Sequence, residues 1–253
     1  ENTPFPISQM ISGVEQAIAT ENPDVILVYG DTNSTLAGAI GAVKNEIPLV
    51  HVEAGLRSFN LDMPEEGNRI LTDHSSRLLF SPTIQGVNNL KKEAIDDSFI
   101  FPCGDVMYDN SIYYAEKARH KSTILQDFGL TKESYLLLTC HRPSNTDCKE
   151  NLSEIFDALR KLSKKTGKKV VFPIHPRTKK QILTFFGEEY LELELGDFLL
   201  LPPTSFLDTI ILISNADFII TDSGGIQKEA YFFRKKSLVL RNETEWVEIV
   251  VND

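Results

Sequence analysis

Short apolar runs alternate with amphipathic segments along most of the chain. The runs at residues 25–29 and 49–52 are rich in β-branched and aliphatic residues, and a small-residue segment with helical character, residues 35–44, separates them. This order is typical of a β-α-β unit with parallel strands. Because strand and helix patterns continue to alternate as far as residue 240, the sequence predicts an α/β protein with parallel sheets.

The predicted elements fall into two series, one in each half of the chain. Strands are predicted at residues 25–29, 49–52, 78–82, 99–101, 135–139, 169–174, 198–201, 218–221 and 237–240. Helices are predicted at residues 7–20, 35–44, 65–77, 83–94, 152–166, 178–186, 206–214 and 224–233, with Thr83 as an N-cap. The boundary between the two series falls near residues 105–119, where the segment 117–121 is charged. We therefore expect two domains, residues 1–112 and 113–253.

Acidic side chains follow the first two strands and begin the next helix. Asp31 and Glu53 lie at the carboxyl ends of adjacent predicted strands, where ligands bind in open parallel sheets. A carboxylate in such a crevice suits proton transfer. Each residue also has a structural explanation: Asp31 as a helix N-cap, Glu53 as a partner of Arg57, and Glu65 with Glu66 as first-turn acids favoured by the helix dipole.

In the second half, Ser223, Gly224 and Gly225 follow an apolar strand and open a helix. Two glycines allow close approach of the backbone to a ligand, and the N–H groups of a helix start favour phosphate. An ordinary tight turn would have the same residues. One turn later, Glu229 could accept hydrogen bonds from a ribose diol, or it could be a solvated helix acid.

Two histidines also follow predicted strands directly. His141 precedes Arg142, and His175 is separated from Arg177 by one proline. A histidine at a strand end is placed for acid–base chemistry, and the arginines could neutralise phosphate. The structural alternatives are a hydrogen bond from His141 to a loop carbonyl and a domain-closing salt bridge for Arg177.

The ordered set of motifs resembles the non-hydrolysing UDP-N-acetylglucosamine 2-epimerase family. The motifs are GDTNST at residues 30–35, HVEAGLRS at 51–58, PEEGNR at 64–69, CHR at 140–142, IHPRT at 174–178 and TDSGGIQKEA at 221–230. The resemblance implies a GT-B-type fold of two Rossmann-like domains with an interdomain cleft. Two departures are Lys228, where the family often has an acid, and Pro143-Ser144, where it commonly has an acidic residue after HRx.

The resemblance also implies roles for individual residues. It makes Asp31, Glu53, Glu65 and His141 the catalytic candidates. The residues that it implies for binding the UDP moiety are Phe206, Ser223, Gly224, Gly225, Glu229 and Arg241. From their charge and position we add Arg57, Arg69, Arg142, His175 and Arg177 as candidates for binding the UDP-sugar. From its sequence pattern alone, Phe206 would rather be a core residue.

The implied reaction inverts C2 of the sugar by eliminating UDP to a 2-acetamidoglucal intermediate and adding it back. This chemistry needs acid–base groups on both faces of the sugar and donors for the departing diphosphate, and we expect no cofactor and no metal. The alternatives are an epimerase of a modified UDP-2-acetamido sugar, a hydrolysing 2-epimerase, a GT-B glycosyltransferase, and a UDP-binding fragment without turnover. Residues 241–248 resemble a branch that includes epimerases of modified UDP sugars.

Composition restricts the partners and the compartment. Of 253 residues, 42% are hydrophobic and 25% charged, and the net charge of −10 without a basic block argues against nucleic-acid binding. No apolar stretch reaches about 18 residues, so we expect no membrane span. Three cysteines without metal-ligand spacing are typical of a reducing compartment. We expect a cytoplasmic protein, and the family resemblance implies a homodimer that serves cell-surface polysaccharide synthesis. We also expect a natural protein that extends beyond both Glu1 and Asp253.

Overall fold

The chain divides into two compact units. The computed structural model describes residues 6–193, 195–241 and 246. Among these, the first unit comprises the residues up to Val106 together with Trp246, and the second begins at Met107. The boundary expected between residues 112 and 113 falls instead inside a continuous helix, α5 (Val106–Lys121).

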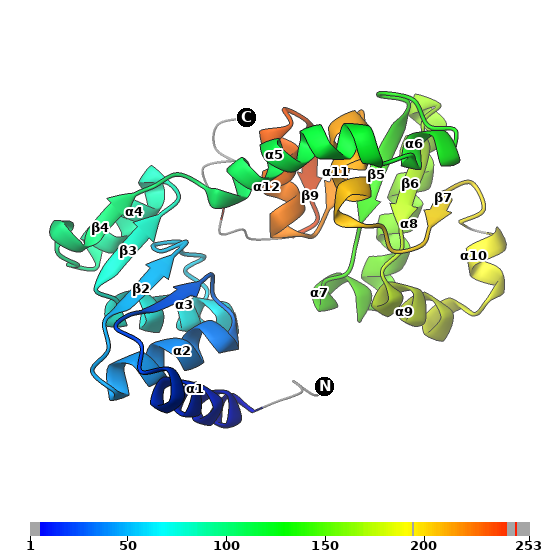
Figure 1. Cartoon of the computed structure of the whole chain (residues 1–253). Helices are drawn as coiled ribbons and strands as arrows, with labels where there is room; N and C mark the ends of the chain where they lie inside the picture. Colours follow the sequence, from blue (N-terminus) through cyan, green and yellow to red (C-terminus); the bar gives the residue numbers. More distant parts are fainter. Residues whose placement is uncertain (1–5, 194, 242–245, 247–253) are drawn as a thin grey trace. The chain divides into compact units, whose positions relative to one another are not determined.

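The first unit contains a parallel sheet with the strand order β1-β2-β3-β4 (Figure 1). Its strands are β1 (Ile26–Tyr29), β2 (Leu49–Val52), β3 (Leu78–Ser81) and β4 (Ile100–Pro102). Its helices are α1 (Ile7–Glu21), α2 (Asn33–Lys44), α3 (Pro64–Ser75), α4 (Ile84–Lys92) and a 3-10 turn at Asp97–Phe99. Each predicted strand is confirmed to within one residue at either end.

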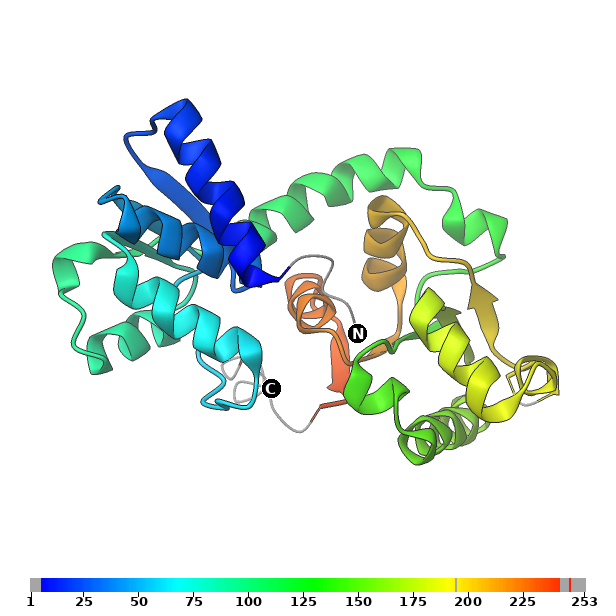
Figure 2. The same cartoon turned by 90° about the horizontal axis from the view of Figure 1, so that it is seen from below.

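The sequential strand order places the helices of this unit on one side of the sheet. Right-handed crossovers that always advance in the same direction carry α2, α3 and α4 to the same face. α1 packs against α2 (Figure 2). Val25, Leu27 and Tyr29, which alternate along and just before β1, remain between 47% and 64% exposed.

Local signals explain where the helices of the first unit begin. The Thr83 hydroxyl accepts a 3.0 Å hydrogen bond from the backbone N–H of Gly86, which confirms the predicted N-cap. Pro64 occupies the first turn of α3, where its missing N–H costs nothing. Glu65 and Glu66 follow it in the same turn, where the helix dipole favours acids.

The second unit contains a parallel sheet with the strand order β7-β6-β5-β8-β9. Its strands are β5 (Tyr135–Thr139), β6 (Lys169–Pro173), β7 (Leu199–Leu201), β8 (Phe218–Thr221) and β9 (Lys236–Val239). The chain leaves β5 towards β6 but returns to β8 on the other side, so the strand order reverses between β5 and β8. In doubly wound folds, ligands bind at this switch point, beyond the carboxyl ends of the two strands.

Helices cover both faces of the second sheet (Figure 1). The helices are α5, α6 (Ile124–Asp127), α7 (Pro143–Thr146), α8 (Lys149–Thr166), α9 (Pro176–Phe186), α10 (Glu189–Leu193), α11 (Phe206–Asn215) and α12 (Gly224–Phe232). One hydrophobic core joins α5, α11 and α12 to the sheet through residues such as Leu137. The other joins α8 and α9 to the opposite face around Phe156 and Phe172.

The sequence did not predict α5, which lies where a domain linker was expected. Its apolar positions do not gather on one side, and Ile112 and Tyr113 stay about half exposed. Only the small face formed by Ser111, Ala115 and Ala118 is buried. The short helices α6, α7 and α10 were also not predicted. Among the described residues we find no helix with the length and apolar character needed to cross a bilayer.

Candidate active site

Asp31 follows β1 after Gly30 and is bound by an arginine from α3. Its carboxylate oxygen Oδ2 is 2.7 Å from Nη2 and 2.9 Å from Nε of Arg69. The N-cap position of α2 belongs to Thr32, so Asp31 does not cap the helix. Asn68 donates a 2.9 Å hydrogen bond to the backbone carbonyl of Asp31. These contacts fix a half-buried, ion-paired carboxylate at the strand end.

Glu53 lies directly after β2 in a strained backbone conformation. Its φ is +79°, a left-handed value that costs a non-glycine residue about 1–3 kcal/mol. Its backbone N–H and that of Ala54 both donate to the carbonyl of Phe80 at 3.0 Å, which holds the chain in this conformation. A Cβ placed on Gly30 would lie 3.5 Å from Oε2 of Glu53. The Glu53 carboxylate therefore lies beside the backbone that precedes Asp31.

A close contact between two glycines supports the loop after Glu53. Gly55 has a φ of +85°, and a Cβ there would lie 2.4 Å from the carbonyl oxygen of Gly86. Asn89 reaches back from α4 and donates a 3.0 Å hydrogen bond to the carbonyl of Gly55. The start of α4 is thus a rigid support for this loop. Sequence reasoning missed Gly86, which no motif marks.

The structure separates the two acids at the start of α3. Glu66 is 1% exposed, and its carboxylate accepts hydrogen bonds from the backbone N–H groups of Ser58 and Phe59. Burial raises the pKa of Glu66, but the hydrogen bonds from Ser58, Phe59 and Arg69 outweigh burial and leave the pKa below its ordinary value. Glu65 is only half buried. Glu66 therefore ties down the loop, and Glu65 remains a predicted candidate for proton transfer.

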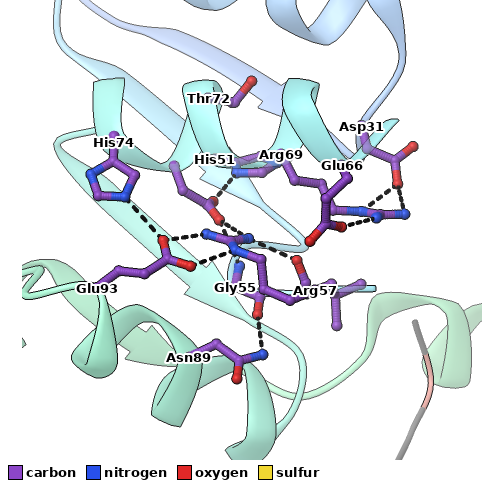
Figure 3. Close-up of polar contacts among 12 residues, drawn as sticks. Asp31, His51, Gly55, Arg57, Glu66, Arg69, Thr72, His74, Asn89 and Glu93 are labelled. Atoms are coloured by element: carbon purple, nitrogen blue, oxygen red, sulfur yellow. Dashed lines mark hydrogen bonds and ion pairs between the residues drawn. The ribbon is translucent and has the colours of Figure 1, made fainter. Parts of the chain in front are cut away.

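Arg57 is buried in ion pairs within the first unit (Figure 3). Its Nη1 lies 2.7 Å from Oδ2 of Asp73, and its Nε lies 2.7 Å from Oε1 of Glu93. The expected alternative of a Glu53 partner is therefore replaced by Asp73 and Glu93. Because the guanidinium is already bound by two carboxylates, we infer that Arg57 supports the loop rather than a diphosphate.

His51 links two loops of the first unit. Its ring lies in β2 with no exposed surface, between Asp73 of α3 and the backbone of Gly30 (Figure 3). Asp73 contributes to the same cluster and is not part of any recognised motif. The partners are separated by about twenty residues in the chain, so no local pattern could have paired them.

Asp222 organises the switch point of the second unit. It follows β8, is fully buried, and accepts hydrogen bonds from the backbone N–H groups of His141 at 2.9 Å and Arg142 at 2.8 Å. Asn145 donates a third hydrogen bond of 3.1 Å. The residue thereby joins the carboxyl ends of β5 and β8. Sequence analysis missed this role, although an aspartate after an apolar strand was the available signal.

His141 projects from this junction with its ring partly exposed. Its Nδ1 lies 3.3 Å from Oδ1 of Asp222. Burial lowers the pKa of His141, the charge of Asp222 raises it, and His175 and Arg142 lower it again, with a net downward shift. A neutral ring that donates from Nδ1 to Asp222 keeps Nε2 available as a proton acceptor.

His175 and Arg177 frame the neighbouring strand end. The rings of His141 and His175 are 5.8 Å apart between centroids. Nδ1 of His175 accepts a 3.2 Å hydrogen bond from the backbone N–H of Arg177, which caps α9. Arg177 forms a 2.6 Å salt bridge with Asp147 inside the second unit. The two histidines thus come together, whereas Arg177 is directed towards the loop before α8.

Ser223 caps α12 at the end of β8. Its backbone N–H donates to Thr221, and its hydroxyl accepts a 3.4 Å hydrogen bond from the N–H of Ile226. Gly224 and Gly225 form the first turn of α12, and Gly224 is buried. The predicted strand–turn–helix junction is confirmed. Its N–H groups and helix dipole make it suitable for a phosphate group.

Glu229 is buried in α12 rather than solvated. It is 5% exposed, and burial raises its pKa to about 7, against a lowering effect of the adjacent Lys228. Lys228, which departs from the family pattern, is itself 2% exposed. A ligand that donates hydrogen bonds to the Glu229 carboxylate would favour its charged form and lower this pKa.

A cavity of about 280 Å³ opens beside His141 in the second unit. Its lining includes His141, His175, Pro203, Thr204, Thr209 and Ser223.

Phe206 does not line this cavity. Its ring is 50% exposed and packs edge-on against Tyr114, with 5.4 Å between the ring centroids. It is thus not the core residue that its pattern favoured. A larger cavity of about 690 Å³ lies along α8, β8 and β9, but its lining is mainly apolar and excludes His141.

The remaining binding candidates lie near the same junction. Arg142 provides the N-cap of α7, and Arg241 is half buried and lines the larger cavity. Most of the segment 241–248 lies outside the described residues, apart from Arg241 and Trp246.

In the part of the chain that the structure describes, no group of three His, Cys, Asp or Glu side chains is placed to hold a metal ion.

Comparison with known proteins identifies the family. Residues 6–253 match the family model described as UDP-N-acetylglucosamine 2-epimerase. The chain belongs to the UDP-N-acetylglucosamine 2-epimerase family. Two parallel α/β units and the structural relatives below confirm the predicted GT-B-type fold class.

Several family members are similar over almost the whole chain. A UDP-N-acetylglucosamine 2-epimerase homolog of Methanococcus maripaludis is 46% identical over 98% of this chain and 68% of its own. A UDP-2,3-diacetamido-2,3-dideoxy-D-glucuronate 2-epimerase of Pseudomonas aeruginosa is 43% identical over 96% of this chain and 65% of its own. The chain thus spans about two thirds of the length of these relatives.

A solved structure of the family agrees with the fold of the chain. It is the UDP-GlcNAc 2-epimerase of Methanocaldococcus jannaschii in complex with UDP-GlcNAc and UDP. It is 39% identical, and the match covers 97% of this chain and 67% of that protein with a TM-score of 0.87.

Proposed function

We propose that the complete protein interconverts UDP-N-acetylglucosamine and UDP-N-acetylmannosamine. The observation that carries the proposal is the pair of carboxylates, Asp31 and Glu53, at adjacent strand ends of a family member. The 39% identity to an enzyme solved with UDP-GlcNAc and UDP supports the substrate class.

The reaction would proceed by elimination and re-addition. A base removes the proton on C2 while the bond between C1 and the UDP oxygen breaks, and the electron pair forms the double bond of 2-acetamidoglucal. UDP then adds back to C1, and C2 takes a proton on its opposite face. Acid–base groups on both faces of the sugar are therefore required.

The proposed roles divide between the two units. Asp31, Glu53 and Glu65 of the first unit, with His141 of the second, would transfer protons. Asp31 lies at the strand end in a 2.7 Å ion pair with Arg69 and is a candidate base. His141, with its lowered pKa, suits a proton acceptor near neutral pH.

The second unit would bind the UDP moiety. The start of α12 at Ser223, Gly224 and Gly225 offers N–H groups to the diphosphate, and Glu229 offers a carboxylate to the ribose. Arg142, His175, Arg177, Phe206 and Arg241 remain binding candidates. Arg69 would contribute to the site indirectly, by holding Asp31, with which it forms an ion pair.

A second substrate has sequence support of equal strength. The relative that acts on UDP-2,3-diacetamido-2,3-dideoxy-D-glucuronate is 43% identical, whereas two archaeal UDP-N-acetylglucosamine 2-epimerases are 42% and 39% identical. Sequence identity thus gives no preference between the two sugars. An epimerase of a modified UDP-2-acetamido sugar is accordingly the second candidate.

The cellular setting forms part of the same proposal. The family resemblance supports a homodimer that supplies a sugar nucleotide for cell-surface polysaccharide, and the small number of cysteines, three in all, supports a cytoplasmic location.

Product analysis of the complete protein tests the proposal. Incubation with UDP-N-acetylglucosamine should yield UDP-N-acetylmannosamine, identified by NMR or chromatography. Free N-acetylmannosamine with UDP would instead indicate a hydrolysing enzyme. Turnover of only the diacetamido glucuronate substrate would establish the second candidate. Transfer of the sugar to an acceptor would indicate a glycosyltransferase, and UDP binding without any turnover would indicate a binding protein.

A further inference from the structure

The buried ring of His51 faces a hydrogen-bond acceptor on each side. Nδ1 lies 2.6 Å from Oδ1 of Asp73, and Nε2 lies 2.8 Å from the backbone carbonyl of Gly30. Carbonyl and carboxylate oxygens accept hydrogen bonds but do not donate them. Both contacts are hydrogen bonds when each ring nitrogen carries a proton, as in an imidazolium beside an ionised Asp73.

The charges around His51 balance under this assignment. Asp73 accepts from His51 with one oxygen and from Arg57 with the other, at 2.7 Å. Arg57 in turn binds Glu93 at 2.7 Å. Two cations thus alternate with two carboxylates in one largely buried chain (Figure 3). Buried charges require such pairing, so the imidazolium completes a neutral cluster.

This cluster links the loops that carry the two strand-end carboxylates. Gly30, whose carbonyl His51 holds, immediately precedes Asp31. Asp73 also accepts a 3.1 Å hydrogen bond from the backbone N–H of Gly55, two residues after Glu53. The His51–Asp73 pair therefore fixes the backbone at Gly30, next to Asp31, and at Gly55, close to Glu53.

We propose that His51, anchored by Asp73, is a positioning residue that holds Asp31 and Glu53 in register for proton transfer at C2. The inference rests on the proposed epimerase function. His51 has no exposed surface, so it acts through the two loops and not on the substrate. Misplacing a catalytic group by about 1 Å costs about 10²-fold in rate.

Variants of the complete protein test this role. His51→Gln can bond to only one of the two partners. We expect its kcat for C2 epimerisation to fall about 10²-fold, with KM and UDP affinity nearly unchanged because the UDP candidates lie in the second unit. His74→Gln is the matched control, since His74 also pairs with a carboxylate, Glu93, at 3.0 Å but is 46% exposed. We expect the control to retain wild-type kcat.

The outcomes separate the inference from the function on which it rests. No epimerisation by the wild type would refute the proposed function. Wild-type activity together with an equally active His51→Gln would overturn the positioning role. A loss in His51→Gln that merely follows the folded fraction or UDP binding would overturn it as well.

A measurement on the wild-type protein stays decisive if His51→Gln does not fold. In a ¹⁵N-labelled sample, both ring nitrogens of His51 should show directly bonded protons in NMR spectra. A single protonated nitrogen would contradict the clamp between Asp73 and Gly30.

Discussion

The carboxylate of Asp222 holds His141 through both its backbone and its ring. It accepts a 2.9 Å hydrogen bond from the backbone N–H of His141 and lies 3.3 Å from Nδ1 of the ring. One buried side chain therefore sets both the position and the tautomer of a candidate proton acceptor.

Replacement of Asp222 should impair catalysis strongly. In Asp222→Asn, the side chain no longer offers charged acceptors to both backbone N–H groups, and His141 loses the partner that orients its ring. We expect kcat to fall by about 10²-fold, the scale of a general acid–base contribution. Steady-state kinetics of the complete protein measure this loss.

Asp217→Asn is the matched control for this prediction. Asp217 adjoins the opposite end of β8 and forms a partly exposed salt bridge of 2.7 Å with Lys168. Its loss should leave kcat within about twofold, because exposed pairs contribute little. Equal losses in Asp222→Asn and Asp217→Asn would contradict the role assigned to Asp222.

Glu229 should make stability depend on pH between its unfolded and folded pKa values. Burial raises its pKa from 4.5 to about 7, so the folded state binds the proton more tightly than the unfolded state. The contribution is fully present below 4.5 and is lost as the pH rises to about 7. The shift corresponds to about 3 kcal/mol.

Urea unfolding of the wild type and Glu229→Gln across this range checks the effect. The stability of the wild type relative to Glu229→Gln should decrease as pH rises from 4.5 to 7 and then stay constant. A difference that does not change with pH would show that Glu229 titrates normally.

The positions of the strands could be predicted from sequence, because buried parallel strands leave short aliphatic runs that end at Gly, Pro or acidic residues. Strand β2, for example, was predicted with its observed bounds, Leu49–Val52. Helix α5 could not be predicted, since only Ser111, Ala115 and Ala118 are buried along its sixteen residues. A helix with so narrow a buried face leaves no clear apolar period.

The sequence predicts the positions of the site residues that follow strands, but not the partners that hold them. Asp31, Glu53, His141 and Ser223 follow strands, so their positions at a sheet edge follow from the topology. The partners that hold them come from elsewhere in the chain: Asp222 reaches His141 from 81 residues away. Such pairs are decided by tertiary packing, which one sequence does not reveal.

Arg57 should contribute to stability more than to ligand binding. Arg57→Met would leave the buried carboxylate of Asp73 without its charge partner, and breaking a buried pair costs about 3–5 kcal/mol. Chemical denaturation should report this loss, whereas His74→Gln, at the exposed end of the same chain of charges, should cost about 0.5 kcal/mol. Similar losses of stability in Arg57→Met and His74→Gln would contradict the burial assigned to the Arg57–Asp73 pair.

The contact between Gly55 and Gly86 should not tolerate a side chain. Gly55→Ala would place a Cβ 2.4 Å from the carbonyl of Gly86 at a φ of +85°, so we expect a loss of about 3 kcal/mol or more. Gly13→Ala is the control, because a Cβ there meets no atom within 4 Å in helix α1. That change should stabilise the protein by about 0.5–1 kcal/mol. Thermal unfolding of both variants tests the prediction, which an undiminished Tm for Gly55→Ala would refute.

The most direct test of the proposed chemistry follows the hydrogen on C2. The complete protein is incubated with UDP-N-acetylglucosamine in deuterated water, and the C2 signal is followed by NMR for the wild type, Asp31→Asn and Glu53→Gln. We predict that deuterium enters C2 as UDP-N-acetylmannosamine forms, and that both variants slow this exchange by at least about 10²-fold. Epimerisation without deuterium at C2, or variants as fast as the wild type, would contradict the account.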